Sequence, residues 1–143
     1  MKHTITCRAT LKATERERVW DVWTDLNAYP SWDEREEVNK LDGPFGPGTT
    51  GTFKQRGRGA GRYTIVAVEP GRSWTTHIAL PGGLLEIEHF VEGEAGAVEV
   101  VKRYNITGPM ALLFKLFFAR GIVKQMPGSF AALDAEVARR AAV

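Results

Sequence analysis

The sequence predicts an α+β fold in which a curved antiparallel sheet of about seven strands packs against a long C-terminal helix. Three observations lead to this expectation. The middle of the chain is a series of strand-like runs separated by short breaks rich in glycine and proline. A short helical signal follows the first strand, and the last third of the chain is rich in Leu, Phe and Ala without strand-like alternation. Helices gathered on one side of an antiparallel sheet are typical of the α+β class.

The first strand is indicated by apolar residues at every second position, namely Ile5, Cys7, Ala9 and Leu11. A helix follows at once, because Thr14 and Glu17 have the spacing of a capping box with Thr14 at the N-cap. Its buried face comprises Val19, Val22, Trp23 and Leu26. The residue before a proline disfavours the helical conformation, so we expect this helix to end before Pro30 and residues 31–32 to form a short second turn.

The central part of the chain predicts a meander of strands. Residues 42–51 read as a loop, because Gly, Pro, Asp and Thr dominate this stretch. Strand-like runs follow at regular spacing, over residues 51–56, 62–69, 73–80, 84–92 and 97–107. Parallel strands need long crossover connections, whereas the breaks here are short. The runs therefore predict antiparallel hairpins.

The last third of the chain predicts a helix. Pro109 follows the last strand, and proline suits the first position of a helix. Residues 110–126 are apolar without alternation. A helical stripe then resumes with Phe130, Leu133 and Val137. Because proline disrupts a helix interior, Pro127 leaves two interpretations, which are one long helix kinked at this residue or two helices in series.

Composition narrows the class of protein. A chain of 143 residues fits a single domain over residues 1–143. A net charge of +2 gives no strong uniform field, so we expect no nucleic-acid partner. Cys7 is the only cysteine, which fits a reducing compartment. Residues 1–12 lack the apolar run of a secretory signal. The longest apolar run, residues 110–119, falls short of the roughly 20 residues that span a bilayer. We expect a soluble, cytoplasmic protein without stable membrane insertion. The sequence leaves open whether the chain forms a homodimer.

Three local patterns resemble a known family. They are V-W-D-V-W-T-D-L followed by Y-P-S-W over residues 19–32, V-E-P-G-R-S-W over residues 68–74, and T-G-P at residues 107–109. With the order of elements, they are similar to the START-like (SRPBCC) superfamily of polyketide cyclase/dehydrase-related and lipid-transport proteins. The resemblance covers nearly the whole chain and implies the helix-grip fold, with two short helices after the first strand. It implies no single activity, because the superfamily includes lipid carriers, hormone and flavonoid binders, cyclases and co-chaperone modules.

A curved sheet with one helix laid across it need not close its interior, and the gap is a natural pocket. Residues 112–118 are apolar most of the way round the helix. One interpretation is a helix buried on several sides by the sheet and the short helices. In another, the surplus apolar residues face a ligand cavity, and in a third they face a membrane or a partner. Phe114, Phe117 and Phe118 are the aromatic residues of interest in this segment.

Polar residues at inward strand positions are candidates for orienting an apolar ligand. His89 shares its phase with Ile87, and Lys102 shares its phase with Tyr104. Buried imidazoles and charges usually find partners, so these groups supply ligand contacts unless a bulge shifts the phase or Lys102 extends outward. Arg120 interrupts the apolar helix, and it either caps the cavity, binds an acid group of the ligand or faces solvent. With aromatic residues that serve as cavity wall or as core, the candidate ligand-binding set is Trp32, Phe53, Tyr63, Trp74, His89, Lys102, Tyr104, Phe114, Phe117 and Arg120.

Residues 56–62 read R-G-R-G-A-G-R and precede a strand. A dinucleotide fingerprint would open a helix, so we interpret this segment as a basic hairpin loop that can act as a lid over the cavity. The three histidines, His3, His77 and His89, lack the spacing of metal ligands, and no serine lies in a nucleophile elbow. The sequence therefore predicts no metal, no cofactor and no catalytic residue.

The leading hypothesis is binding or transport of a small hydrophobic molecule, such as a lipid, a quinone or a polyketide-like compound, between the sheet and the final helix. The alternative is a metal-free cyclase, dehydratase or isomerase that uses His89 with Tyr104 or Lys102 in acid–base chemistry. A third hypothesis is a protein-interaction or stress-response adaptor that uses the exposed part of the last helix. The sequence favours binding over catalysis and does not identify the ligand.

Overall fold

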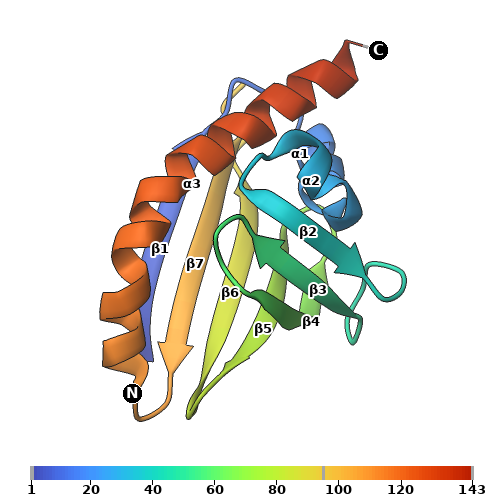
Figure 1. Cartoon of the computed structure of the whole chain (residues 1–143). Helices are drawn as coiled ribbons and strands as arrows, with labels where there is room; N and C mark the ends of the chain where they lie inside the picture. The colour runs from blue at the N-terminus through green and yellow to red at the C-terminus, as the bar shows by residue number, and fades with distance from the viewer. Residues whose placement is uncertain (1, 95, 143) are drawn as a thin grey trace.

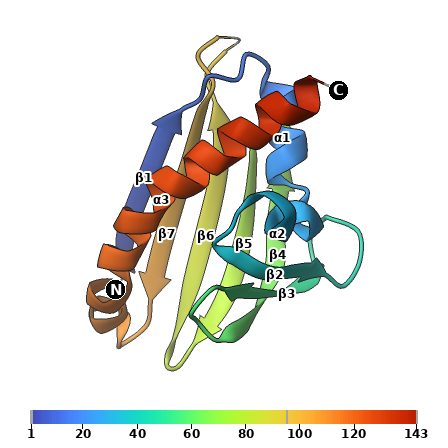
Figure 2. The same cartoon turned by 45° about the horizontal axis from the view of Figure 1, so that its top comes forward.

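The computed structural model describes residues 2–94 and 96–142. Within these residues, seven strands form one antiparallel sheet in the order β1-β7-β6-β5-β4-β3-β2 (Figure 1). The strands are β1 (Lys2–Thr10), β2 (Glu36–Leu41), β3 (Thr50–Gln55), β4 (Ala60–Glu69), β5 (Ser73–Leu80), β6 (Gly83–Glu92) and β7 (Glu99–Thr107). Figures 1 and 2 show that β2 and β3 run across the direction of the other strands, so the sheet curls and has a concave face.

The helices lie on the concave side of the sheet. They are α1 (Arg16–Trp23), the 3-10 turn η1 (Leu26–Ala28), α2 (Tyr29–Trp32) and α3 (Ala111–Ala141). Figure 2 shows α3 crossing the sheet diagonally, with α1 near its C-terminal end. Helix α3 packs against β1, β7 and α1. The expected α+β plan, with about seven strands, two short helices after the first strand and a long C-terminal helix, is confirmed.

The expected start and end of the first helix are wrong. Helix α1 begins at Arg16 with Glu15 at the N-cap, so Thr14 lies one residue before the cap. The helix ends at Trp23, because residues 24–28 turn the chain through η1 instead of continuing the α-helix. Pro30 lies in the first turn of α2, where its missing N–H costs no helical hydrogen bond.

Strand β2 has no counterpart among the runs predicted from the sequence. Its residues, E-E-V-N-K-L, are mostly charged or polar, as suits a strand at the edge of a sheet. The pairing of β2 with β3 also shifts between Glu36 and Val38. A register shift of this kind breaks the period of two, so the alternation that identifies a strand is lost here.

Helix α3 is one helix that continues through Pro127. It begins at Ala111, two residues after Pro109. Pro127 is exposed, and Figure 1 shows that the helix bends along its length. A bend of this kind is expected where a proline removes one backbone hydrogen bond from a helix.

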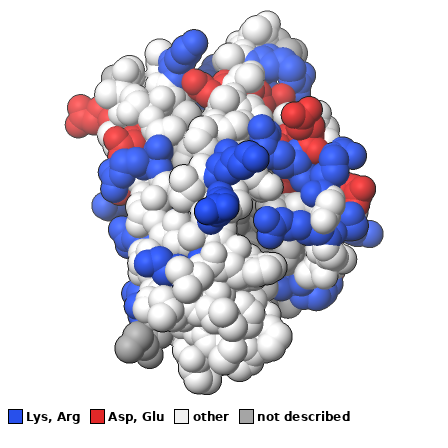
Figure 3. All heavy atoms as spheres, turned by 60° about the vertical axis from the view of Figure 1, so that its left-hand side comes forward, with Lys and Arg blue, Asp and Glu red and all other residues white. Residues whose placement is uncertain are grey.

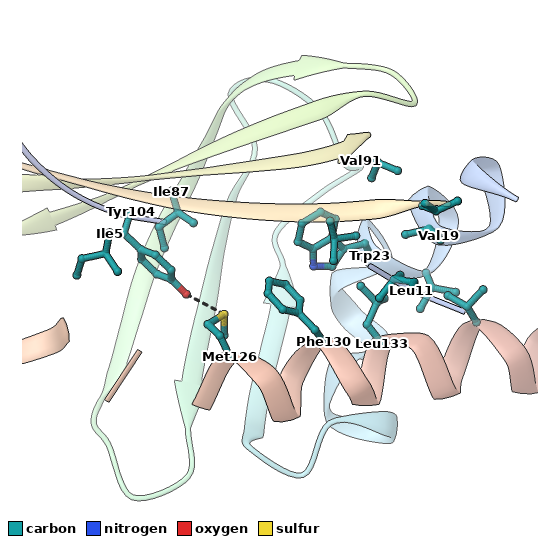
Figure 4. Close-up of a cluster of buried hydrophobic side chains, with 14 residues drawn as sticks. Ile5, Leu11, Val19, Trp23, Ile87, Val91, Tyr104, Met126, Phe130 and Leu133 are labelled. Atoms are coloured by element: carbon teal, nitrogen blue, oxygen red, sulfur yellow. Dashed lines mark hydrogen bonds between the residues drawn. The ribbon is translucent and has the colours of Figure 1, made fainter. Parts of the chain in front are cut away.

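The core fills only one end of the space between α3 and the sheet. Four residues at helical spacing on the second half of α3 are buried, namely Met126, Phe130, Leu133 and Val137. They pack with Val19, Val22 and Trp23 of α1 and with inward residues of β1, β6 and β7. Figure 4 shows Phe130 and Leu133 pointing from α3 toward the sheet, and Tyr104 pointing from β7 toward Met126. In the first half of α3, Ala119 and Ile122 still pack against this core, whereas residues 112, 113, 116 and 117 are exposed.

Candidate functional site

A cavity of about 720 Å³ lies between the concave face of the sheet and the first half of α3. Its floor comes from β5, β6 and β7, and its far wall comes from β2, β3 and β4. Its helix side is formed by Phe117, Phe118, Ile122 and Met126. The lining is mostly aliphatic and aromatic, with a small number of polar groups, which is the usual make-up of a small-molecule site.

The register of the sheet brings the polar floor residues into neighbouring positions. His89 of β6 is paired with Lys102 of β7 on one side and with Trp74 of β5 on the other. Two residues further along β7, Tyr104 is paired with Ile87, which is paired in turn with Thr76. Directly opposed residues on one face of a sheet lie within contact distance. The sequence phases of separate strands therefore converge in two rows on the cavity floor.

His89 is held as a neutral, oriented imidazole. Its ring stacks on the indole of Trp74, with centroids 3.6 Å apart and an interplanar angle of 3°. Its Nδ1 lies 3.1 Å from the carbonyl oxygen of Trp74, where an Nδ1–H donates a hydrogen bond. Burial and the nearby charge of Lys102 hold the pKa of His89 well below its usual value, more than the Trp74 carbonyl raises it. The imidazole is therefore neutral near pH 7.

Lys102 places a positive charge in this row, next to His89. Its Nζ lies 5.3 Å from the centroid of the Tyr104 ring. Burial lowers the pKa of Lys102, but Tyr104 and the carboxylate of Glu36 raise it by more, so the ammonium stays protonated. Burial raises the pKa of Glu36, and the charge of Lys102 offsets part of this rise. The Tyr104 hydroxyl donates to the sulfur of Met126 at 3.4 Å.

Two aromatic side chains of the far wall lie over glycines of the neighbouring strand. Gly51 is paired with Tyr63, and Phe53 is paired with Gly61. A Cβ atom added at Gly61 would lie 2.6 Å from the Phe53 ring, and one added at Gly51 would collide with the Tyr63 ring. The Tyr63 hydroxyl donates to Oδ1 of Asn39 at 2.7 Å, which fixes the ring from its other end. The two glycines therefore leave the space that the rings occupy.

The loop between β3 and β4 reaches helix α3 at the mouth of the cavity. Gly57, Arg58 and Gly59 of this loop all line the cavity. A Cβ added at Gly121 of α3 would lie 2.8 Å from Nη2 of Arg58. The basic loop that the sequence suggests as a lid therefore lines the cavity, with its arginine beside the helix.

The structure brings seven of the ten candidate residues to the cavity, namely Phe53, Tyr63, Trp74, His89, Lys102, Tyr104 and Phe117. The other three lie elsewhere. Trp32 packs edge-on against Tyr29, with ring centroids 5.1 Å apart, beside the main core. Phe114 stacks on Phe118, with centroids 6.0 Å apart, at the start of the helix. Arg120 is exposed, because it lies on the side of α3 that faces away from the sheet.

Several cavity residues were not among the candidates. Glu36 and Asn39 belong to β2, the strand that was not predicted. Thr76 shares the inward phase of Trp74, so the same alternation could have identified it. Met126 lies on the helix face that continues to Phe130 and could likewise have been found from helical spacing.

Two further properties of the described residues bear on what the site can do. Among residues 2–94 and 96–142, no three His, Cys, Asp or Glu side chains are placed to hold a metal ion. Within the same residues, no helix is long and apolar enough to cross a membrane. The cavity therefore offers a ligand apolar walls, hydroxyl and amide groups, a neutral imidazole, the Lys102 ammonium, the Arg58 guanidinium and the Glu36 carboxylate.

Comparisons with known proteins agree with this architecture. The profile of the family described as "Polyketide cyclase / dehydrase and lipid transport" matches residues 2–138. A search of curated proteins gives no significant match.

Solved structures with the same fold come from proteins of different kinds. The Zhui aromatase/cyclase from Streptomyces sp. R1128 has a TM-score of 0.77 at 14% identity, covering 99% of this chain and 96% of that one. Ara h 8.0201 has a TM-score of 0.72 at 14% identity, covering 97% and 99%. Norcoclaurine synthase from Thalictrum flavum has a TM-score of 0.70 at 13% identity, covering 99% and 94%. At such low identity these likenesses establish the fold alone.

Proposed function

Because the chain belongs to the polyketide cyclase/dehydrase and lipid transport family, we propose that it binds a small apolar molecule in the cavity beneath α3. The ligand carries an acidic or hydrogen-bond-accepting group that lies beside Lys102. Lipids, quinones and polyketide-like compounds meet this description. The cavity volume is in the range of natural ligand sites, which is roughly 300–1,000 Å³.

One observation carries this proposal, which is the placement of a single ammonium group, that of Lys102, on a mostly apolar cavity floor. Lys102 lies between Cys7 and His89 in one cross-strand row, and neither is an anion near pH 7: burial raises the pKa of Cys7, and His89 is neutral. A buried ammonium is costly unless a partner compensates it. Tyr104 and Glu36 supply this compensation within the protein. An acceptor group on a ligand would be a further partner for the ammonium, while the ligand's apolar body covers the aromatic walls.

Native mass spectrometry of the chain purified from its own host tests the proposal. We expect an adduct of a few hundred daltons that organic solvent extracts. The variant Ile78→Trp, which adds bulk to a cavity-lining position, should lose the adduct, while Ala79→Trp on the outer face should keep it. An adduct-free wild-type protein whose melting temperature no apolar compound library shifts would overturn the proposal.

A second candidate function is acid–base catalysis on a polyketide-like ligand. The observation that favours it is that His89, Lys102 and Tyr104 all line the cavity, with Glu36 facing them. Clusters of groups with shifted pKa values in a cleft are typical of catalytic sites. Proton exchange next to the carbonyl of a small β-diketone, followed by NMR in deuterium oxide, tests this candidate. Catalysis is supported if the wild type accelerates the exchange and Lys102→Met does not. Equal exchange rates with the two proteins would exclude it.

A further inference from the structure

The first half of α3 exposes an apolar face to solvent. With 3.6 residues per turn, five large apolar residues fall on one side of the helix. They are Leu112, Leu113, Leu116, Phe117 and Val123. Leu116 is 68% exposed and Phe117 is 75% exposed. We refer to these five residues as the exposed face of α3.

This exposure is concentrated rather than scattered. Of the eight large hydrophobic residues that are exposed among residues 2–94 and 96–142, six lie between Met110 and Val123. The opposite side of the same helix already carries Phe118 and Ile122, which line the cavity. The interpretation that this segment is buried on several sides is therefore wrong. Concentrated apolar exposure of this kind marks an interaction surface.

The charges around the exposed face are all positive. Arg120 and Lys124 are exposed and lie on the same side of the helix as Leu113 and Phe117. No Asp or Glu occurs between Gly108 and Leu133 in the sequence. Figure 3 shows this side of the molecule, where the lower part is white, bordered by blue and free of red. The exposed face thus joins apolar side chains to uncompensated cations.

We propose that the exposed face of α3 docks on the surface of a bilayer that contains anionic lipids. The leucines and Phe117 enter the boundary between head groups and acyl chains, and Arg120 and Lys124 lie among the lipid phosphates. An anionic surface attracts basic residues at the interface. The docking is peripheral, since no helix within the described residues is long and apolar enough to span a membrane.

Charge complementarity favours a bilayer over a second copy of the chain. A symmetric dimer brings the same patch of both copies together. Arg120 and Lys124 would then face the same cations, or the apolar residues, of the partner copy. An anionic lipid surface instead satisfies the cations and the apolar residues at once.

The docked orientation has a consequence for the cavity. Phe117 belongs to the exposed face and also lines the cavity, next to the loop that holds Arg58. Docking therefore places the mouth of the cavity against the membrane. The docking itself goes beyond the ligand-binding proposal, because it does not depend on what the cavity holds.

Flotation with lipid vesicles tests the docking. The probes are vesicles of phosphatidylcholine alone and vesicles of phosphatidylcholine with phosphatidylserine. We expect the wild type to float with the vesicles that contain phosphatidylserine and to float less with vesicles of phosphatidylcholine alone. High salt should reduce flotation with the phosphatidylserine vesicles. The double substitution Leu113→Glu with Leu116→Glu should lower the partition constant at least about tenfold. Val66→Glu, at an exposed position of β4, is the matched control and should bind like the wild type.

The cations give a second, independent comparison. Replacing Arg120 and Lys124 by alanine should lower binding to phosphatidylserine vesicles about fivefold for each charge removed, with little change on phosphatidylcholine. Ile78→Trp, which fills the cavity, should float like the wild type, so a failure of ligand binding leaves this result unaffected. Circular dichroism and thermal melting confirm that each variant is folded.

Three results would overturn the docking proposal. The first is a wild-type protein that does not float with phosphatidylserine vesicles. The second is a Leu113→Glu, Leu116→Glu variant that floats as well as the wild type. The third is a dimer in light scattering that Leu113→Glu with Leu116→Glu converts to a monomer, without vesicle binding by the wild type. The exposed face would then be an interface between copies of the chain.

Discussion

The imidazole of His89 lies flat on the indole of Trp74, and the two residues occupy opposed positions on neighbouring strands of the cavity floor. The stack and the bond from Nδ1 to the Trp74 carbonyl fix both the position and the tautomer of the imidazole. Its other nitrogen, Nε2, is then an acceptor. A neutral, immobile His89 next to a protonated Lys102 defines a polar strip that a ligand would meet along one side of the cavity.

Burial of neutral His89 predicts a pH-dependent loss of stability. Its folded-state pKa lies below the unfolded value of about 6.5, so the unfolded chain binds the proton first as the pH falls. The free energy of unfolding should therefore decrease below about pH 6.5, by up to about 1.4 kcal/mol per pH unit. Urea unfolding between pH 7 and pH 5 measures this slope. His89→Phe keeps an aromatic ring on Trp74 and should show a shallower slope; identical slopes would contradict the assignment.

The glycine opposite Phe53 predicts a specific cost for a single methyl group. In Gly61→Ala the new Cβ would meet the Phe53 ring, which has to move from its place in the cavity wall. We expect a loss of about 1–3 kcal/mol in the free energy of unfolding. Gly46→Ala, where no atom lies within 4 Å of the added Cβ, is the control and should be nearly neutral. A Gly61→Ala variant as stable as the control would show that the ring is not confined.

Much of the cavity floor could be predicted from the sequence because strands have a period of two. The phases of β5, β6 and β7 identified Trp74, His89, Lys102 and Tyr104 as inward-facing without knowledge of the register. The register then placed them side by side, and no single strand contains that information.

Other parts of the site depend on contacts between distant segments. Glu36 and Asn39 escaped prediction because a register shift and a polar composition hide β2. The contact of Arg58 with Gly121 joins a loop to a helix far away in the sequence. The apolar pattern of α3 indicated surplus hydrophobic residues, but it could not tell which side meets the cavity and which side meets solvent.

The contact of Arg58 with α3 predicts a gate at the cavity mouth. Removing the guanidinium in Arg58→Ala should open the mouth and raise the association and dissociation rates of an apolar probe together, with little change in Kd. Stopped-flow fluorescence with an apolar fluorophore measures both rates. Arg56→Ala, in the same loop, removes a guanidinium that donates to the Glu34 carbonyl and should leave both rates unchanged. Rates unaffected by Arg58→Ala would exclude a gate.

Lys102 predicts a preference for ligands that carry an acid group. The wild type should bind decanoic acid more tightly than decanol by about tenfold, since a hydrogen bond to a charged group contributes about 1.5–3 kcal/mol. Competition against an apolar fluorophore gives both affinities. Lys102→Met should bind the two compounds alike, while Lys40→Met, an exposed lysine of β2, should keep the preference. A preference that survives in Lys102→Met would mean that another group recognises the acid.

The most direct test of ligand binding beneath α3 is the affinity of an apolar fluorophore for two neighbouring tryptophan variants. Ile78 lines the cavity, and Ala79, the next residue of β5, lies exposed on the other face of the sheet. The two substitutions add a similar bulk to opposite faces. Ile78→Trp should weaken binding at least about tenfold, because the indole takes the space of the ligand, while Ala79→Trp should bind like the wild type. Equal affinities in two folded variants would contradict a ligand site in this cavity.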